Sequence, residues 1–295
     1  MKPYLISCAI SLLSLPLAAH DNTRDENSNG NDQLLAPTHL PQQKFSGVAG
    51  LTPTTDIYQL TVFDTNYLLP VFQTQSLNQD YYRPQNPNGG DVGNTNVQFQ
   101  FSLKYGLAHN LFTDNDGLYL AYSQISNWQA YDKSAYFRDS QYQPQLFWTW
   151  LHGKDESTWQ STSLGFEHQS NGKGGIYERS WNRVYVEFSL DFNQVTLSIK
   201  PWLRANVTST NYNPDISDYL GYGRVKADWY MGEHQLSFTL RNLLESGFSN
   251  GYEEISWKFP LYKGFKGYIT LQSGYGMTIS DYNHYDNAAG IGIAF

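Results

Sequence analysis

The feature that most limits how this chain can fold is a period-two alternation of apolar and polar residues that recurs along most of its length. Residues 97–105 alternate Val, Phe, Phe, Leu and Tyr with Gln, Gln, Ser and Lys, and residues 195–204, 235–241 and 265–272 contain similar alternation. Alternation over such lengths predicts β-strands that have one apolar and one polar face.

Two architectures satisfy this pattern. In a soluble β-sandwich the apolar faces meet each other, whereas in a membrane barrel they face lipid and the polar faces line the lumen. The strand-like segments are about ten residues long, which is enough to cross a bilayer when tilted. The chain contains 23 Tyr and 8 Trp, and these recur near segment ends, where an aromatic girdle would lie.

The end of the sequence also favours the barrel. Ala289, Ile291, Ile293 and Phe295 alternate up to a terminal aromatic residue, and this ending resembles the C-terminal signal of bacterial outer-membrane barrels. We therefore expect an all-β fold, a transmembrane antiparallel β-barrel of about twelve strands. The expected strands are residues 66–75, 95–107, 117–128, 141–153, 160–170, 181–191, 194–205, 218–230, 233–243, 252–260, 264–276 and 285–295, and residues 78–95 are expected to form a loop.

The N-terminal residues predict export. Lys2 precedes a mostly apolar stretch over residues 5–17, and Ala18 and Ala19 supply small residues for cleavage, so residues 1–19 are read as a signal peptide. The alternative, an anchor helix, is disfavoured because the apolar stretch is short for a membrane span. Residues 20–50 are polar and are expected to form a flexible periplasmic arm, which leaves residues 51–295 for the barrel.

Removal of the signal peptide limits the chemistry that the remaining chain can perform. Cys8 is the only cysteine and leaves with it, so cysteine nucleophiles, thiolate metal sites and disulfides are excluded. Loss of Lys2 changes the formal charge from −8 to −9. An acidic chain without a basic cluster is a poor candidate for binding nucleic acid, and we expect none.

Three polar residues interrupt the face that is expected to contact lipid. Leu164 and Phe166 set the outward face of their strand, and steps of two then place His168 and Ser170 outward as well. The next strand presents Val184 and Val186 outward, and Asn182 shares their register. Adjacent antiparallel strands can bring the imidazole, hydroxyl and amide together on one wall.

Polar groups that face hydrocarbon are costly unless they are paired. Here an Asn oxygen can accept a hydrogen bond from one imidazole nitrogen, and the other nitrogen can take the serine proton. This is the arrangement of a nucleophile, a base and an orienting residue. The alternative is that all three lie at the headgroup level and meet water.

The residues around this trio are similar to bacterial outer-membrane phospholipase A. The resemblance is carried by residues 168–172 (His-Gln-Ser-Asn-Gly) and 179–183 (Arg-Ser-Trp-Asn-Arg), with further matches at 64–68, 142–147, 195–202 and 213–215. It runs from about residue 56 to the end of the chain. It implies a twelve-stranded barrel in the bacterial outer membrane that hydrolyses acyl esters of phospholipids and lysophospholipids, requires Ca²⁺ and is activated by forming a homodimer.

Residue by residue, the resemblance implies that Ser170 is the nucleophile, His168 the base and Asn182 the orienting residue. It places calcium ligands at the main-chain carbonyl of Lys173 and at residue 178. The family has a serine at the latter position, whereas this chain has Glu178, which is also a hard oxygen ligand. Ser134 aligns with a third ligand that comes from the partner subunit, and Gln124 aligns with a glutamine that contacts the partner.

Two functions remain to be separated. The first is an interfacial lipase with weak discrimination between ester positions, giving phospholipase A1, phospholipase A2 and lysophospholipase activity. The second is a porin-like or structural barrel without catalysis. A channel needs its polar chemistry inside the lumen, so an outward-facing His168, Ser170 and Asn182 favour the lipase.

Overall fold

A computed structural model describes residues 58–152, 158–205, 211–262 and 264–295. The expected signal peptide (1–19), the expected arm (20–50) and the first residues of the expected barrel domain lie outside these ranges. The strands are β1 (Leu60–Val62), β2 (Tyr67–Thr74), β3 (Thr95–His109), β4 (Asp116–Gln129), β5 (Tyr136–Leu151), β6 (Trp159–Ser170), β7 (Ser180–Phe192), β8 (Val195–Ala205), β9 (Gly223–Met231), β10 (His234–Arg241), β11 (Tyr252–Tyr262), β12 (Phe265–Tyr275) and β13 (Tyr285–Ala294).

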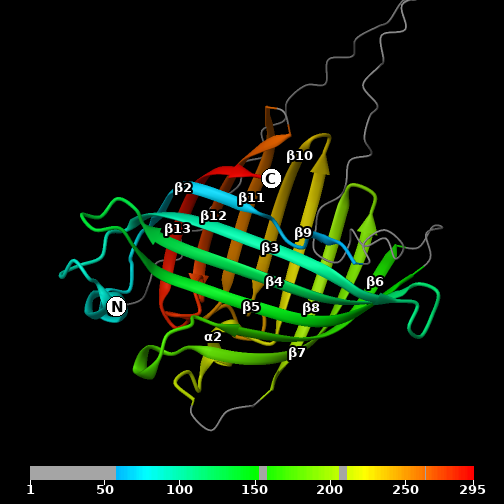
Figure 1. Cartoon of the computed structure of the whole chain (residues 1–295), viewed down its shortest axis with the longest axis horizontal. Coiled ribbons are helices and arrows are strands. Elements are labelled where there is room, and N and C mark those ends of the chain that lie inside the picture. Colours follow the sequence, from blue (N-terminus) through cyan, green and yellow to red (C-terminus); the bar gives the residue numbers. More distant parts are fainter. Residues whose placement is uncertain (1–57, 153–157, 206–210, 263) are drawn as a thin grey trace, which may run out of the picture. The chain divides into compact units, whose positions relative to one another are not determined.

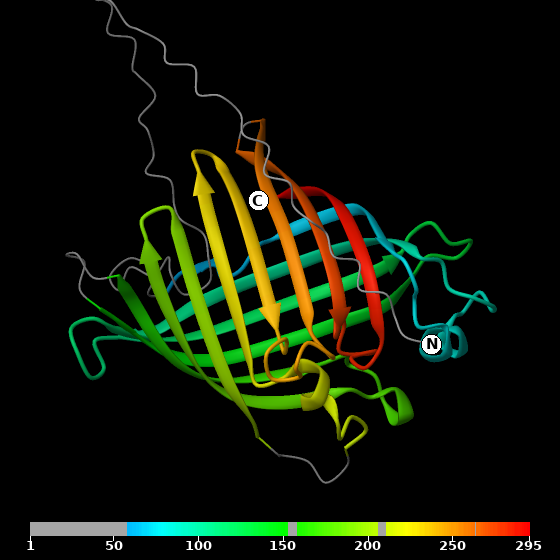
Figure 2. The ribbon, with the colours of Figure 1, turned by 180° about the vertical axis from the view of Figure 1, so that it is seen from behind.

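The strands form a closed antiparallel barrel (Figures 1 and 2). Each strand from β2 to β13 pairs with its neighbours in the chain, and the pairing of β2 with β13 closes the cylinder. The short strand β1 pairs with β3 beside β2, with Val62 opposite Leu103. The prediction of a twelve-stranded transmembrane barrel is confirmed, with β1 as an addition.

The short helical elements lie in loops at one end of the barrel. They are α1 (Gln79–Tyr82), η2 (Arg83–Gln85), η3 (Gly175–Tyr177) and α2 (Ile216–Leu220), and each follows an even-numbered strand. Among the described residues, no helix is long and apolar enough to cross a membrane.

One expected strand begins too early in the sequence-based prediction. Residues 218–222 were expected to open a strand, but α2 covers part of this range and β9 begins at Gly223. Ile216 and Leu220 lie four residues apart, so one helical face buries both side chains. Gly221 then ends the helix with a φ of +68°, a conformation that glycine adopts without a steric penalty.

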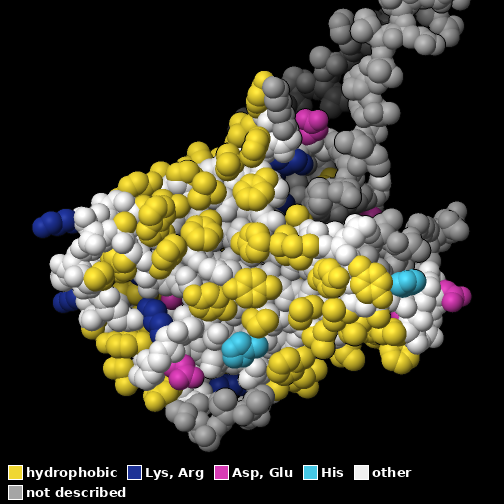
Figure 3. Space-filling view, in the orientation of Figure 1, with side chains coloured by type: hydrophobic (Ala, Val, Ile, Leu, Met, Phe, Trp, Pro, Cys, Tyr) yellow, Lys and Arg dark blue, Asp and Glu magenta, His cyan; other side chains and the backbone are white. Residues whose placement is uncertain are grey.

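The outer wall is apolar and the lumen is polar. Along β6, Leu164 and Phe166 are exposed, whereas Ser163 and Glu167 are buried inside the barrel. Figure 3 shows hydrophobic side chains spread over the visible wall, with most charged side chains near its edges. This alternation gives each strand a lipid-facing and a lumen-facing side, as the sequence predicts.

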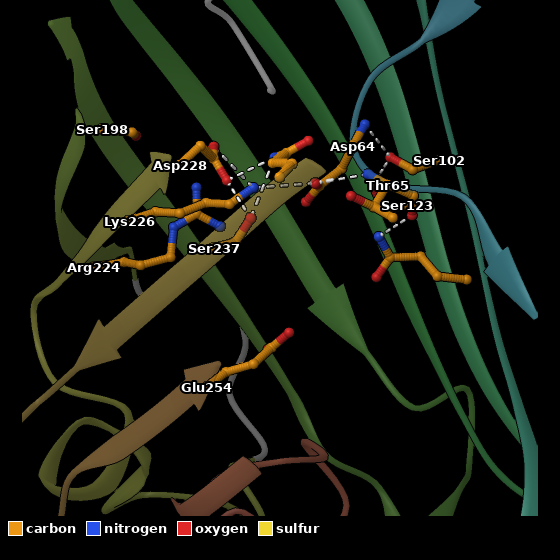
Figure 4. A network of polar contacts seen from close by, with 12 residues as sticks. Asp64, Thr65, Ser102, Ser123, Ser198, Arg224, Lys226, Asp228, Ser237 and Glu254 are labelled. Carbon is orange, nitrogen blue, oxygen red and sulfur yellow. Dashed lines mark hydrogen bonds and ion pairs between the residues drawn. The ribbon is translucent and has the colours of Figure 1, made fainter. Parts of the chain in front are cut away.

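Packed side chains and a polar network share the lumen. A cluster of buried, mostly aromatic residues gathers side chains from the strands, from α2 and from the loop between β12 and β13; it contains Tyr119, Ala121, Phe147, Trp181, Tyr185, Trp202, Ile216, Leu220, Ile279 and Tyr282. Elsewhere a cavity of about 230 Å³ is lined by charged and polar groups. Lys226 lies between Asp228 and Asp64 there, at 3.6 and 3.7 Å (Figure 4).

Candidate active site

His168 and Asn182 lie directly opposite each other on neighbouring strands. They are paired in the register of β6 and β7, two positions beyond the pair of Phe166 and Val184. Phe166 and Val184 are both exposed on the outer wall. Because side chains two residues apart share a face, the imidazole and the amide emerge on the lipid-facing side.

A hydrogen bond joins the two side chains. His168 Nδ1 lies 2.8 Å from Asn182 Oδ1. An amide oxygen can only accept, so this contact assigns the proton to Nδ1 and leaves the Nε2 lone pair free when the ring is neutral. The imidazole is therefore held in the tautomer that a general base requires.

Ser170 ends β6 on the same face, two residues after His168. It pairs with Tyr142 of β5 on one side and with Ser180 of β7 on the other. Within the described residues no hydrogen bond links the Ser170 hydroxyl to the His168 ring. Catalytic hydrogen bonds are often long in ligand-free proteins, and side chains two residues apart are neighbours on one face of a strand.

The loop that follows Ser170 closes on itself through Asn171. Its side-chain oxygen accepts hydrogen bonds from the main-chain nitrogens of Lys173 and Arg179, at 3.2 and 3.1 Å. Its own main-chain nitrogen donates to the Arg179 carbonyl. Residues 171–179, which we term the β6–β7 loop, are thereby tied at both ends immediately beside Ser170.

A glycine is required in this loop. Gly172 has a φ of +67°, and a Cβ atom there would lie 2.7 Å from the ring of Tyr142. The left-handed backbone and the close aromatic ring both exclude a side chain. Tyr142 therefore packs directly over the turn that carries the chain away from Ser170.

On the lumen-facing side, buried ion pairs join the strands that carry His168 and Asn182. Glu167 lies between Arg183 and Lys200, with ion pairs to both, and Lys200 Nζ is 2.7 Å from its carboxylate. Glu167 and Arg183 are the register pair next to His168 and Asn182. The lumen side of the β6–β7 hairpin thus locks the register that brings the imidazole and the amide together.

The residues expected to bind calcium present suitable oxygen donors. Lys173 and Glu178 lie in the β6–β7 loop, and the Glu178 carboxylate forms no ion pair or hydrogen bond within the described residues. A main-chain carbonyl and a carboxylate are hard oxygen ligands of the kind that calcium prefers. The described part of the chain contains no cluster of three His, Cys, Asp or Glu side chains, so a metal here would need carbonyl or hydroxyl ligands in addition.

The cation of Lys173 is engaged elsewhere. Its Nζ donates to Gln85 Oε1 at 2.7 Å and to the Arg138 carbonyl at 3.0 Å. Burial lowers the pKa of this ammonium group, and the carboxylate of Asp139 acts in the opposite direction. The side chain thus anchors the loop, while the main-chain carbonyl is the atom that the sequence resemblance predicts as a calcium ligand.

Ser134 and Gln124 lie apart from these ligands. Ser134 is exposed in the loop between β4 and β5, and no contact brings it to Lys173 or Glu178 within the described residues. Gln124 lies on the outer face of β4, where its amide bonds to Tyr122 and Ser126 of the same strand, at 2.8 and 3.0 Å. Their roles at a subunit interface stay predictions.

The structure also brings in residues that the sequence did not single out. Tyr142 separates Gln124 from Ser170 in one row across β4, β5 and β6. Tyr81 and Asn88, from the loop after β2, contact the β6–β7 loop and the Ser134 carbonyl. Contacts between positions so far apart in the chain leave no local pattern that a reader of the sequence could recognise.

Comparisons with known proteins identify the family of this chain. The family model of phospholipase A1 matches residues 51–295. A phospholipase A1 homologue from Neisseria meningitidis is 34% identical over 78% of this chain, although the match spans only 63% of that longer protein. Phospholipase A1 of Salmonella typhimurium is 31% identical, and the match covers 95% of this chain and 93% of the relative.

Solved structures match as well. The outer membrane phospholipase of Salmonella typhi, a dimer with bound calcium, superposes with a TM-score of 0.74 at 30% identity over 81% of this chain and 92% of that one. An active-site mutant of outer membrane phospholipase A from Escherichia coli, in which an asparagine is replaced by alanine, gives the same TM-score and identity over 83% and 93%. Enzymes of this name are carboxylic ester hydrolases. The chain therefore belongs to the phospholipase A1 family and is a β-barrel of the bacterial outer membrane.

Proposed function

We propose that this protein is a calcium-dependent phospholipase that hydrolyses the acyl esters of phospholipids and lysophospholipids by a Ser170–His168–Asn182 mechanism. The observation that supports this most strongly is the hydrogen bond between His168 and Asn182 on the lipid-facing wall. An active-site asparagine in the matching Escherichia coli enzyme is in keeping with the role given to Asn182.

The chemistry follows from the positions of the three side chains. His168 Nε2 takes the proton of Ser170 as the hydroxyl oxygen attacks the acyl carbonyl, and the proton then passes to the leaving lysophospholipid oxygen. Asn182 keeps the ring oriented throughout. Water, activated by the same imidazole, then attacks the acyl-enzyme and releases the fatty acid.

An amide is a reasonable orienting group at this place. The imidazole and the amide lie on a wall that contacts hydrocarbon, where an ionised carboxylate is costly. A neutral oxygen still accepts the Nδ1 hydrogen bond that fixes the tautomer. The substitution of Asn for the more common Asp therefore suits the surroundings.

Calcium, when bound, supplies positive charge that stabilises the oxyanion of the tetrahedral intermediate. The Lys173 carbonyl and the Glu178 carboxylate are the proposed ligands from one subunit. Ser134 is the proposed ligand from the partner subunit. A carboxylate in place of a hydroxyl adds one negative charge to the site, which favours calcium binding.

We further propose that the active form is a homodimer. The Salmonella typhi relative is a dimer with bound calcium, and Gln124 lies on the same outer wall as Ser170. Two such walls side by side would form a cleft open to lipid, into which a phospholipid acyl chain can enter laterally. Such a cleft holds acyl chains loosely, so we expect cleavage at both ester positions.

A channel function has less support. Side chains of α2 and of the loop between β12 and β13 pack with Trp181 and Trp202 inside the barrel, and a polar cavity among the described residues measures about 230 Å³. Wide porin channels are built on larger barrels, of 16–18 strands. The polar trio on the outer wall would also serve no purpose in a channel.

Hydrolysis of phospholipid vesicles by the purified protein tests the proposal. We expect Ser170→Ala to lower the rate by at least about 10³-fold, because no nucleophile remains to form the acyl-enzyme. Ser163→Ala is the matched control, since Ser163 lies on the same strand but faces the lumen, where it bonds to Thr149. Its activity should stay near that of the wild type.

Calcium is tested in the same assay by adding chelator. We expect activity to disappear with chelator and to return with added calcium. Equal fatty-acid release by wild type and Ser170→Ala would contradict the role of Ser170 as the nucleophile. Hydrolysis at the same rate with and without chelator would contradict the requirement for calcium.

A further inference from the structure

The loop between β2 and β3 contacts both segments of its subunit that carry proposed calcium ligands. We term residues 75–94 the β2–β3 loop. On one side it packs against the β6–β7 loop, which carries Lys173 and Glu178, and on the other it reaches the main chain of Ser134. Among the described residues, no other loop makes hydrogen bonds to both segments.

Tyr81 makes the contact with the β6–β7 loop. Its hydroxyl donates to the Tyr177 carbonyl at 2.8 Å and accepts from Asn171 Nδ2 at 3.1 Å. The rings of Tyr81 and Tyr177 meet edge to face, with centroids 5.8 Å apart. Burial raises the pKa of Tyr81 to about 12, so the hydroxyl stays neutral and keeps both hydrogen bonds at physiological pH.

Asn171 links Tyr81 to the segment that carries the proposed calcium ligands. It is the residue whose side-chain oxygen holds the main-chain nitrogens of Lys173 and Arg179. Two cations also rest on the Tyr81 ring, with Lys173 Nζ 5.3 Å and the Arg179 guanidinium 5.2 Å from its centroid. Tyr81 therefore contacts the β6–β7 loop at Asn171, where the loop begins, and at Lys173 and Arg179, on either side of the segment that carries the proposed ligands.

Asn88 makes the second contact. Its Nδ2 donates to the Ser134 carbonyl at 2.9 Å. Asn88 is itself held by Asn86, whose side-chain oxygen accepts from the Asn88 main-chain nitrogen at 3.0 Å. The Asn86 amide also bonds to the carbonyls of Gly89 and Asp91, which keeps this turn compact.

We propose that Tyr81 and Asn88 are positioning residues of the calcium sites, and that the β2–β3 loop holds the two segments that its subunit contributes, one to its own site and one to the site of the partner. The inference rests on the proposed function, because it takes Lys173, Glu178 and Ser134 as the ligands. Tyr81 acts on the ligands of its own subunit. Asn88 acts on Ser134, which is the proposed ligand in the site of the partner. A change of Asn88 should therefore alter calcium binding in the partner's site.

The full-length protein in detergent micelles tests this. We expect Tyr81→Phe and Asn88→Ala to raise the calcium concentration for half-saturation about three- to tenfold, the effect of a lost hydrogen bond. Binding is measured by equilibrium dialysis with radioactive calcium, and hydrolysis is titrated in parallel. The turnover rate at saturating calcium should stay close to the wild-type value, because neither residue touches substrate.

Tyr285→Phe is the matched control for Tyr81→Phe. This variant also loses a hydroxyl contact at the same end of the barrel, to Ser273 of β12, but Tyr285 is the first residue of β13 and makes no hydrogen bond to the β6–β7 loop within the described residues. Its half-saturating calcium concentration should match the wild type. A shift equal to that of Tyr81→Phe would overturn the inference, because any loss of a hydroxyl would then suffice.

Mixed dimers separate the two residues. One subunit carries Ser170→Ala, so all activity comes from the other. An active Asn88→Ala subunit receives an intact Ser134 segment from this partner, and its calcium response should return to normal. An active Tyr81→Phe subunit should not recover, since its defect lies in its own loop. Recovery of Tyr81→Phe, or none of Asn88→Ala, would overturn the assignment.

Failure of the proposed function gives a different result. In that case the wild type itself would neither bind calcium nor need it. A calcium-dependent wild type whose half-saturation is unchanged by Tyr81→Phe would instead overturn the positioning role alone.

Discussion

At the scale of single residues, function depends on which face of a strand a side chain occupies. His168 and Asn182 are a cross-strand pair, and in antiparallel sheets such pairs lie close enough for direct side-chain contact. A shift of the whole β6–β7 hairpin by one residue would turn both into the lumen. The charged pair of Glu167 and Arg183, one position away, would then face lipid, which is costly. The polarity of the neighbouring residues thus keeps the proposed catalytic pair on the outer face.

Asn182→Ala tests the orienting role. The imidazole would lose the acceptor that holds its Nδ1 proton, so we expect turnover to fall about 10²-fold or more, within the range of general-base catalysis. Asn182→Asp should retain more activity, since its carboxylate can accept the same hydrogen bond. Turnover at saturating calcium is the measurement. An alanine variant as active as the wild type would contradict the role.

At the scale of elements, the conformation of the β6–β7 loop depends on its backbone dihedral angles and on the elements that pack against it. Gly172 turns the chain with a positive φ directly under Tyr142. We expect Gly172→Ala to lower activity strongly while the barrel still folds, because the substitution strains the turn by about 1–2 kcal/mol and displaces the ring or the loop.

Gly174→Ala serves as the control for this variant. Gly174 has a φ of −115°, and a Cβ atom there would meet nothing within 4 Å. Its activity should remain near the wild-type level. Equal losses in both variants would show that the loop tolerates no side chain anywhere, and the contact with Tyr142 would then not explain the loss in Gly172→Ala.

At the scale of the whole molecule, buried ion pairs in the lumen join neighbouring strands and stabilise the barrel. Glu167 is 1% exposed and compensates the cations of Arg183 and Lys200 on two further strands. We expect Glu167→Ala to lower the free energy of unfolding by about 3–5 kcal/mol, the usual cost of removing one partner of a buried ion pair. Water in the lumen would reduce this cost.

Urea unfolding in lipid or detergent, followed by tryptophan fluorescence, measures this effect. Glu253→Ala is the control, because Glu253 is exposed on β11, and it should change stability by no more than about 0.5 kcal/mol. Similar stabilities of the two variants would mean that the lumen is too wet for the ion pairs to matter.

Much of the architecture follows from the sequence alone. The period of two along each strand assigns every side chain to lipid or lumen, so the barrel, its twelve membrane strands and the outward face of Ser170, His168 and Asn182 are local properties of the chain. The close packing of His168 and Asn182 needed only that neighbouring strands pair as a hairpin. α2 was missed because two apolar residues four positions apart within a polar stretch give too short a signal.

Only the tertiary structure decided what surrounds the site. The hydroxyl of Tyr81 bonds to the Tyr177 carbonyl 96 residues further along the chain, and Asn88 reaches Ser134. Loops have no periodicity that encodes such contacts, since their positions depend on where the closed barrel places the ends of its strands. The alternation along the strands therefore encodes the outward position of the proposed catalytic trio, whereas the support of the β6–β7 loop arises when barrel closure brings distant loops to the same rim.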